Sequence, residues 1–346
     1  MAFLLGGSVA ELLLLLLFTT VKTCHPGCRC EEQSFGLFDS FSLTRVDCSG
    51  LGPNIIPVAI PVETSSLDLS SNGIRSIDGA VLSGPGYTTL SSLNLSNNLI
   101  SVMNGSVFSK LCYLETLDLS WNSIENLVEG FSGLPLAKVD LSHNRIHEIH
   151  LNVFRVQDHG RPLSVDLSYN LLKSVTSKLS QPLNIQSLNL AGNELTSVPN
   201  LQDISLRFLT LDENPISVID ELSFIGFKYL LHLSLSSMPD LHTIKPQSLQ
   251  NLQILQVLDL SNNKRLKTLS AEVFHGLTSL QELDLSNCWL TSLPANVLEL
   301  LPSIKSIALR EGVNCWRIQK QEQFHRLVGW SKAEAALTCD VTGVIL

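Results

Sequence analysis

Residues 114–122 read LETLDLSWN, a pattern with leucine at the first, fourth and sixth places and asparagine at the ninth. The same pattern returns every 21–26 residues along most of the chain. Its asparagine place falls at Asn72, Asn98, Asn122, Asn144, Asn170, Asn193, Asn214, Met238, Asn263, Cys288 and Gly312. Eleven phased copies indicate units that are too small to bury their own apolar side and must stack on their neighbours.

This motif is typical of leucine-rich repeats, so the expected fold class is α/β: a curved, horseshoe-shaped solenoid with a parallel sheet on its concave face. Period-two alternation turns the strand leucines inward and the residues between them outward. The asparagine is expected to bond the backbone where the chain leaves the strand. Aromatic residues that recur after it are expected to pack as an inner spine: Phe108, Phe131, Phe154, Phe224 and Phe274.

Composition divides the chain into four segments. Residues 1–23 contain an apolar run that is too short to span a bilayer and is typical of a secretory signal peptide. Residues 24–63 are expected to form an N-terminal cysteine cap and entry strand, 64–312 the repeat array, and 313–346 a C-terminal cap. No later run reaches the ~18 apolar residues of a membrane helix, so we expect a secreted protein without a membrane span.

Six cysteines gather at the two ends of the repeat array. They are Cys24, Cys28, Cys30 and Cys48 before the repeats, and Cys315 and Cys339 after them. An open solenoid end exposes unpaired leucines, and a small cap over it is usually stapled by disulfides, which persist in oxidising compartments. A zinc site at the first four cysteines is the alternative, disfavoured by their spacing and by the export signal.

Two further cysteines lie within the repeats. Cys112 and Cys288 would be some 30 Å apart at about 4.8 Å per strand, so they cannot pair with each other. Cys288 occupies an asparagine place, and we expect a buried thiol that donates weakly to the turn backbone. Cys112 is expected at the surface, where an intermolecular disulfide is a hypothesis.

The outward residue between the two strand leucines builds the concave face. It runs Asp68, Asn94, Asp118, Asp140, Asp166, Asn189, Thr210, Ser234, Asp259, Asp284 and Ala308. We call its six acids the aspartate ladder; Phe208 and His232 intrude near its middle. Strands about 4.8 Å apart give a face on the order of 50 Å long, enough for an interface of about 800 Å² per partner. Two interpretations stay open: docking of a basic or mixed-charge protein ligand, or a surface that serves only solubility and strand-edge hydrogen bonding.

Other chemistry is not indicated. The chain has no nucleophile elbow, phosphate-binding loop or zinc-protease motif, so we expect no enzyme and no cofactor. Nothing in the extended chain gathers His143, His147 and His150, so we interpret them as surface histidines and expect no metal site. The net charge of −9 argues against a nucleic-acid partner.

Two sequons predict N-glycosylation, one at Asn94 and one at Asn104. Asn104 precedes a glycine in a returning loop and is the better acceptor. A glycan on Asn94, inside a strand, would cover the N-terminal third of the concave face and displace ligands toward the C-terminal half.

The N-terminal cysteine spacing and the stretch FGLFDSFSLTRVDCSGLGP, residues 35–53, resemble the secreted small leucine-rich repeat proteins of the proteoglycan type. The resemblance covers residues 24–346. It implies the pairs Cys24–Cys30, Cys28–Cys48 and Cys315–Cys339. It also implies an extracellular modulator that binds bone morphogenetic proteins and their modulators, Frizzled receptors of the Wnt pathway, or other growth factors.

The expected function is therefore secreted and non-enzymatic: the protein sequesters morphogens or occludes their receptors. The aspartate ladder, with Phe208 and His232, is the expected contact surface. The alternative is a structural matrix protein that organises collagen fibrils, although the chain lacks the elongated penultimate repeat of collagen-binding relatives.

Overall fold

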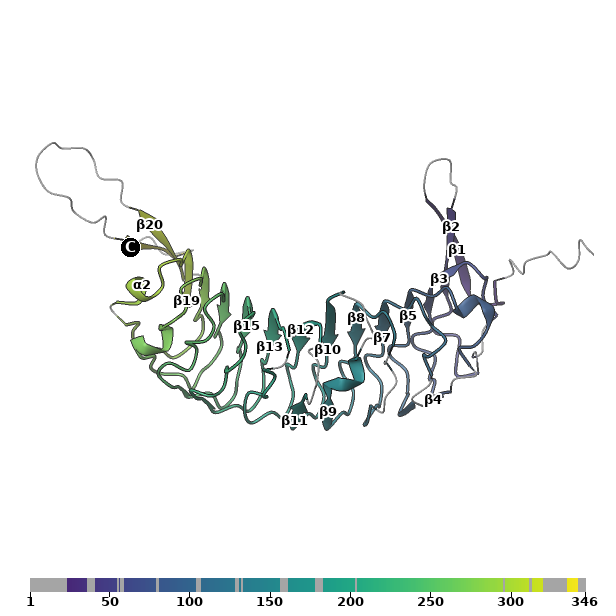
Figure 1. The fold of residues 1–346 in the computed structure, drawn as a ribbon, viewed down its shortest axis with the longest axis horizontal. Coiled ribbons are helices and arrows are strands. Elements are labelled where there is room, and N and C mark those ends of the chain that lie inside the picture. The colour runs from purple at the N-terminus through teal and green to yellow at the C-terminus, as the bar shows by residue number, and fades with distance from the viewer. Residues whose placement is uncertain are drawn as a thin grey trace, which may run out of the picture. The chain divides into compact units, whose positions relative to one another are not determined.

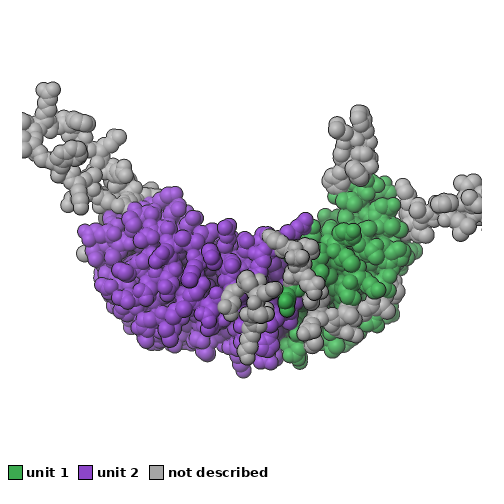
Figure 2. Space-filling view, viewed as in Figure 1, with its two compact units in different colours: residues 1–140, 155–159 green, residues 141–154, 160–346 purple. Residues whose placement is uncertain are grey.

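The computed structural model describes residues 24–35, 41–54, 56, 59–78, 81–103, 107–127, 131, 133–155, 161–177, 183–202, 204–294, 296–310, 313–319 and 335–341. The expected signal peptide 1–23, the sequon at Asn104 and the repeat position Gly312 lie outside these residues. The chain forms two compact units (Figure 2). Unit 1 comprises Met1–Asp140 with Arg155–His159, and unit 2 comprises Leu141–Phe154 with Gly160–Leu346.

Unit 1 begins with an antiparallel hairpin that leads into a parallel sheet (Figure 1). The hairpin strands are β1 (Arg29–Phe35) and β2 (Phe41–Asp47). The sheet then continues in chain order through β3 (Thr64–Asp68), β5 (Ser92–Asn94), β7 (Thr116–Asp118) and β8 (Lys138–Asp140). On the returning side lie the parallel pair β4 (Ser76–Ile77) and β6 (Val102–Met103) and the 3₁₀ helix η2 (Pro85–Tyr87).

Unit 2 carries the longer run of parallel strands. In chain order these are β10 (Leu163–Asp166), β12 (Ile185–Asn189), β13 (Phe208–Thr210), β15 (His232–Ser234), β17 (Val257–Asp259), β18 (Glu282–Asp284) and β19 (Ser306–Arg310). The antiparallel strands β20 (Val313–Gln319) and β21 (Ala335–Val341) follow β19. The returning side holds the parallel pairs β9 (Glu148–His150) with β11 (Ser174–Thr176) and β14 (Val218–Ile219) with β16 (Thr243–Ile244). Its helices are η3 (Leu151–Phe154), η4 (Ala271–Phe274) and α2 (Val297–Leu300).

The strands stack in phase, leucine on leucine. In unit 1, Leu67 lies opposite Leu93 and Leu93 opposite Leu117, and each is at most 1% exposed. In unit 2, Leu233 and Leu258 are paired in the same way and are fully buried. The predicted parallel-sheet solenoid of leucine-rich repeats is confirmed. Among the described residues its returning side contains turns, 3₁₀ segments and only the short α2 as α-helix.

The expected aromatic spine is buried. Its five phenylalanines are each at most 1% exposed: Phe108, Phe131, Phe154, Phe224 and Phe274. In unit 1 the rings of Phe108 and Phe131 stack with centroids 5.9 Å apart. In unit 2 Phe227, which the sequence pattern did not single out, packs edge-on against Phe224 at 5.6 Å. These rings are core packing and not a ligand site.

The repeat asparagine bonds two successive repeats together. The Nδ2 group of Asn98 donates to the carbonyl oxygens of Leu95 in its own repeat (2.9 Å) and Leu69 in the preceding one (3.0 Å). Its Oδ1 accepts the N–H groups of Asn72 (2.9 Å) and Ile74 (3.1 Å), also in the preceding repeat. Equivalent bonds recur at Asn122, Asn170, Asn193, Asn214 and Asn263. These bonds satisfy buried backbone groups that would otherwise have no partner at the turn.

Candidate functional site

The aspartate ladder lies at the outward ends of the strands in both units, and all its members are half-buried. Unit 1 holds Asp68 on β3, Asp118 on β7 and Asp140 on β8; unit 2 holds Asp166 on β10, Asp259 on β17 and Asp284 on β18. Asp118 lies directly opposite Asp140, and Asp259 opposite Asp284. Like charges on strands about 4.8 Å apart repel one another, so these two pairs favour a cationic neighbour.

Most of the ladder aspartates use one carboxylate oxygen for a hydrogen bond within their own repeat. In five of them Oδ1 accepts the N–H of the residue two places on, at 2.8–2.9 Å: Asp68, Asp118, Asp166, Asp259 and Asp284. This bond closes the turn after the strand, as aspartate and asparagine commonly do. Such strand-edge hydrogen bonding is what we expect if the ladder serves only solubility and structure. It occupies only one of the two carboxylate oxygens.

On β5 and β12 an asparagine, Asn94 or Asn189, occupies the ladder position and donates a hydrogen bond to the aspartate on the preceding strand. Asn94 accepts the N–H of the residue two places on at 2.9 Å, as the aspartates do. Its Nδ2 also donates to the second oxygen of Asp68 at 3.1 Å. In unit 2 Asn189 donates in the same way to the second oxygen of Asp166 at 3.0 Å. Asp68 and Asp166 therefore have both oxygens bonded within the protein.

An acid at a different place serves the repeats where the ladder is interrupted. Positions 210 and 234 carry Thr210 and Ser234, and Asp212 lies two residues beyond the first. Its Oδ1 accepts the Ser234 hydroxyl (2.6 Å) and the N–H of Ser236 (2.8 Å). Burial is the main cause that raises the pKa of Asp212 above its usual value, and these bonds oppose it. The sequence signal that could have found it is an aspartate two residues after the ladder position of β13, where threonine replaces the usual aspartate.

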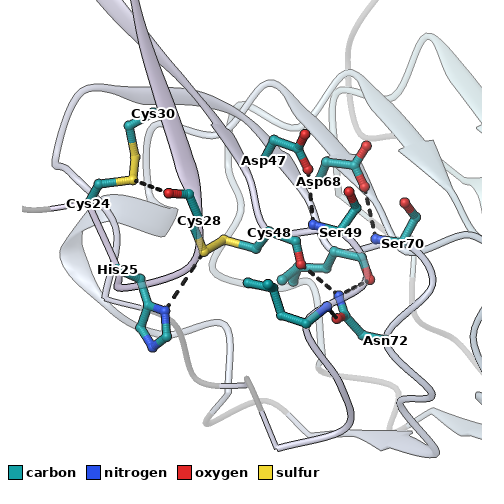
Figure 3. Close-up of a disulfide and its surroundings, with 12 residues drawn as sticks. Cys24, His25, Cys28, Cys30, Asp47, Cys48, Ser49, Asp68, Ser70 and Asn72 are labelled. Atoms are coloured by element: carbon teal, nitrogen blue, oxygen red, sulfur yellow. Dashed lines mark hydrogen bonds between the residues drawn. A yellow bond between two sulfur atoms is a disulfide. The ribbon is translucent and has the colours of Figure 1, made fainter.

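The ladder also begins one strand earlier than the sequence pattern indicated. Asp47 ends β2, lies opposite Asp68, and accepts the N–H of Ser49 at 2.9 Å (Figure 3). The hydrogen bonds from Ser49 are the main cause that lowers the pKa of Asp47. Its flanking residues Val46 and Cys48 are both fully buried, as the leucines are elsewhere. A search for a valine–aspartate–cysteine variant of the motif could have found it.

Phe208 and His232 lie side by side in the middle of the unit 2 face. They are register partners on β13 and β15, with ring centroids 6.3 Å apart. Phe208 is 47% exposed, whereas the other phenylalanine side chains that the structure describes are buried. Next to His232 the face is hollowed by a cavity of about 320 Å³ over β15, β17, β18 and β19. His232 therefore lines the part of the face that can receive a side chain, and Phe208 lies on its other side, away from the cavity lining.

The N-terminal cap is held by two disulfides, Cys24–Cys30 and Cys28–Cys48 (Figure 3). This is the connectivity that the family resemblance implies, and it leaves no thiolates for the alternative zinc site. The carbonyl oxygen of Cys48 also accepts Nδ2 of Asn72 at 2.9 Å, so the cap connects directly to the asparagine series. At the other end Cys315 is disulfide-bonded and lies opposite Cys339 in the β20–β21 pairing; the Cys339 side chain is outside the described set.

The two remaining cysteines differ in their surroundings. Cys288 is half-buried, and its thiol donates to the carbonyl oxygen of Leu260 at 3.0 Å, as expected for a thiol in an asparagine place. Burial is the main cause that raises its pKa to about 11. Cys112 is a free thiol at the surface. The predicted intermolecular disulfide at Cys112 stays a prediction.

The described sequon places a restriction on glycosylation. The Asn94 side chain is half-buried, and both its polar atoms are bonded, Nδ2 to Asp68 and Oδ1 to the N–H of Ser96. A glycan on Nδ2 would have to displace the Asp68 bond. We therefore favour Asn104, outside the described residues, as the acceptor.

An aromatic pair that the sequence reasoning missed lies at one edge of the unit 2 face. The rings of His143 and Tyr169 stack with centroids 4.6 Å apart. Both residues have a positive φ and immediately precede a repeat asparagine. The Tyr169 hydroxyl donates to Glu213 at 3.1 Å, which is the main cause that raises its pKa. Gly192, which directly precedes the next repeat asparagine, leaves room for the Tyr169 ring, since a Cβ there would lie 2.5 Å from that ring.

In the described part of the chain, no group of histidine, cysteine and acidic side chains could hold a metal ion. None of the described helices is long and apolar enough to cross a membrane.

Comparison with known proteins agrees with this architecture. The leucine-rich repeat family matches residues 63–124, 88–146, 204–264, 237–290 and 255–311. Tsukushi of Gallus gallus is 54% identical over 334 residues, which cover 95% of this chain and 90% of that protein. Tsukushi of Danio rerio is 53% identical over 328 residues, covering 94% of each. Lumican of Coturnix japonica is 32% identical over 249 residues, covering 71% of this chain and 68% of that protein. The chain belongs to the Tsukushi family of leucine-rich repeat proteins.

Proposed function

We propose that this leucine-rich repeat binding protein is secreted and modulates morphogen signalling. It sequesters ligands of the bone morphogenetic protein type or occludes Frizzled receptors of the Wnt pathway, without catalysis or a cofactor. Membership of the Tsukushi family supports an extracellular binding role. The two disulfides of the N-terminal cap support an oxidising compartment, where such bonds persist.

The observation that carries the proposal is the outward strand face. Its aspartates are held in place by bonds to their own turns, so little side-chain freedom is lost when a ligand docks. Among the described residues, none donates to the second oxygen of Asp118, Asp259 or Asp284. Within each unit, outward carboxylate oxygens held in this way are complementary to a basic protein surface and accelerate its association.

The mechanism that follows is competitive. A protein ligand lies across the strand face, with its basic side chains on the aspartate ladder and apolar ones on Phe208 and His232. Surface that the ligand needs for its receptor is then covered. Because the contacts are charged and partly exposed, affinity should fall as salt rises.

The test is direct binding of the purified secreted chain to an immobilised bone morphogenetic protein and to a Frizzled ectodomain, at physiological salt. A triple variant, Asp118→Asn with Asp259→Asn and Asp284→Asn, removes three charges. Asparagine already closes the same turn at Asn94 and Asn189, so the variant keeps the turn bonds. We expect saturable binding by the wild type and at least about tenfold weaker binding by the variant.

A matched control removes three charges away from the strand face: Glu194→Gln, Glu221→Gln and Glu299→Gln. The first two glutamates form exposed ion pairs with Lys173 and Lys245, which contribute little to stability. This control should bind as the wild type does. Equal weakening in both triple variants would show a general charge effect and contradict docking on the ladder. Absence of binding to both proteins would favour the matrix alternative, with collagen co-sedimentation as the next measurement.

A further inference from the structure

The hollow in the unit 2 face has a cause in the sequence. On β18 the outward residues are Glu282 and Asp284, and on β19 their register partners are the small Ser306 and Ala308. The longer side chains of β18 therefore border the space above the small Ser306 and Ala308, and this space forms the hollow. The resulting cavity of about 320 Å³ lies at the lower end of the range for sites that enclose a small group.

The hollow combines three kinds of lining. Three carboxylates border it, those of Asp259, Glu282 and Asp284. Apolar side-chain surface comes from the outward Val257 and Ala308, and an imidazole from His232; Leu283 borders the hollow, but its side chain is buried in the core. The exposed ring of Phe208 lies beyond His232 and extends the aromatic side. Such a lining fits a group with an apolar stem and a cationic end.

The carboxylates here differ from those elsewhere on the ladder. Asp259 and Asp284 each use Oδ1 to close a turn, at 2.8 Å. No asparagine follows them as it follows Asp68 and Asp166, because the next outward residue after Asp284 is Ala308. In the described part of the chain no cation pairs with Asp259, Glu282 or Asp284. Among the described side chains, negative charge is therefore concentrated beside the hollow with no cation paired to it.

The nearest lysine in the sequence does not supply that counter-charge. Lys305 immediately precedes Ser306, yet its Nζ donates to the side-chain oxygen of Gln281 at 2.7 Å. In unit 1, by contrast, a lysine stands on the strand face itself, since Lys138 is the outward residue that pairs with Thr116. Among the described side chains, neither of these two lysines therefore neutralises the carboxylates at the hollow.

We propose that the hollow is a socket for a single arginine side chain carried on an exposed loop of the protein ligand. The methylene stem lies on Val257 and Ala308, as long basic side chains commonly cover apolar surface. The guanidinium meets the second oxygens of Asp259 and Asp284 and the carboxylate of Glu282. Its planar fork of five donors suits several carboxylates at once, which the point charge of lysine does not.

This socket deepens the proposed function and rests on it for the identity of the ligand. The probe for the socket alone is a pair of acetylated pentapeptides, Ser-Gly-X-Gly-Ser, in which X is arginine or its neutral isostere citrulline. Saturation-transfer NMR on the full secreted chain detects millimolar binding. We expect transfer to the arginine side-chain methylenes and at least tenfold less to those of citrulline.

The variants are Glu282→Gln combined with Asp284→Asn, and Glu299→Gln as a control that removes charge from the exposed side of α2. The double variant should lower transfer to the arginine peptide at least about tenfold, and the control should leave it unchanged. Equal transfer to both peptides, or no loss in the double variant, would overturn the socket.

The same variants separate the socket from the proposed function. If the chain binds a bone morphogenetic protein or Frizzled and the double variant binds equally well, the socket is wrong and the function stands. If the arginine peptide binds and neither protein does, the socket stands and the ligand class is wrong.

Discussion

Substitution of Asn263 by alanine tests how much the asparagine series contributes to stability. Asn263 is fully buried, and its Nδ2 donates to the carbonyl oxygens of Leu235 (2.8 Å) and Leu260 (2.7 Å). Its Oδ1 accepts the N–H of Met238 at 3.0 Å. Alanine leaves three buried backbone groups without these bonds, each worth about 1–1.5 kcal/mol. We expect a loss of about 3–5 kcal/mol, or roughly 10 °C in Tm.

The assay is thermal and urea unfolding of the secreted chain, together with amide hydrogen exchange. Exchange at Met238 should accelerate most, because that amide loses its acceptor. The control is Asn296→Ala, because the exposed Asn296 makes no side-chain bond at the start of α2. That variant should change stability by less than about 0.5 kcal/mol. A cost below about 1 kcal/mol for Asn263→Ala, with unchanged protection at Met238, would refute the reasoning.

Further predictions concern Ser248, the free cysteines Cys112 and Cys288, and Gly226. The hydroxyl of Ser248 is buried without a hydrogen-bond partner, so Ser248→Ala should raise the free energy of unfolding by up to about 1 kcal/mol in urea titrations. Alkylation followed by mass spectrometry should label exposed Cys112 quickly at pH 8, and Cys288 only near pH 11 or after unfolding. Because the raised Cys288 pKa keeps its proton in the fold, stability should fall as pH rises from about 9 to 11; labelling of both thiols at one rate would contradict this. Gly226 has φ +91° and a Cβ there would lie 2.3 Å from Cβ of Gln202, so Gly226→Ala should lower Tm by several degrees; an unchanged Tm would contradict this.

Much of the fold follows from the sequence because its signals are local and repeated. The leucine and asparagine phase predicts which side chains are buried, and at Cys288 it predicts the thiol bond to the backbone, although this residue is half-buried and not buried. The outward position of the aspartates follows from period-two alternation in the same way. The hydrogen bonds that the ladder carboxylates accept from their own turns, and that Asp68 and Asp166 also accept from Asn94 and Asn189, do not follow, because they depend on the turn after the strand and on the neighbouring strand.

The missed residues depend on register between neighbouring repeats. Asp212 serves Ser236, which is 24 residues away, and its role is visible only when β13 and β15 are aligned. The bond from Tyr169 to Glu213 spans 44 residues and passes over Gly192. Both residues lie at fixed positions before a repeat asparagine, Asp212 two residues before Asn214 and Tyr169 directly before Asn170, so an alignment of the repeats could have pointed to them. The hollow likewise arises from a difference between two strands, Asp284 against Ala308, and not from any one motif.

The asparagine bonds give the stack a direction. Each asparagine outside its own turn serves only the repeat before it, through that repeat's strand carbonyl and turn N–H, as Asn98 does for Leu69 and Ile74. Loss of a repeat from the C-terminal side therefore leaves its predecessor with unsatisfied buried groups. Loss from the N-terminal side removes no side-chain bond from the remaining turns and leaves an asparagine short of partners, although a cut at either end also exposes a strand edge and a leucine layer. A chain of this kind should tolerate shortening from its beginning better than from its end, and during synthesis each repeat is completed only when the next one has emerged.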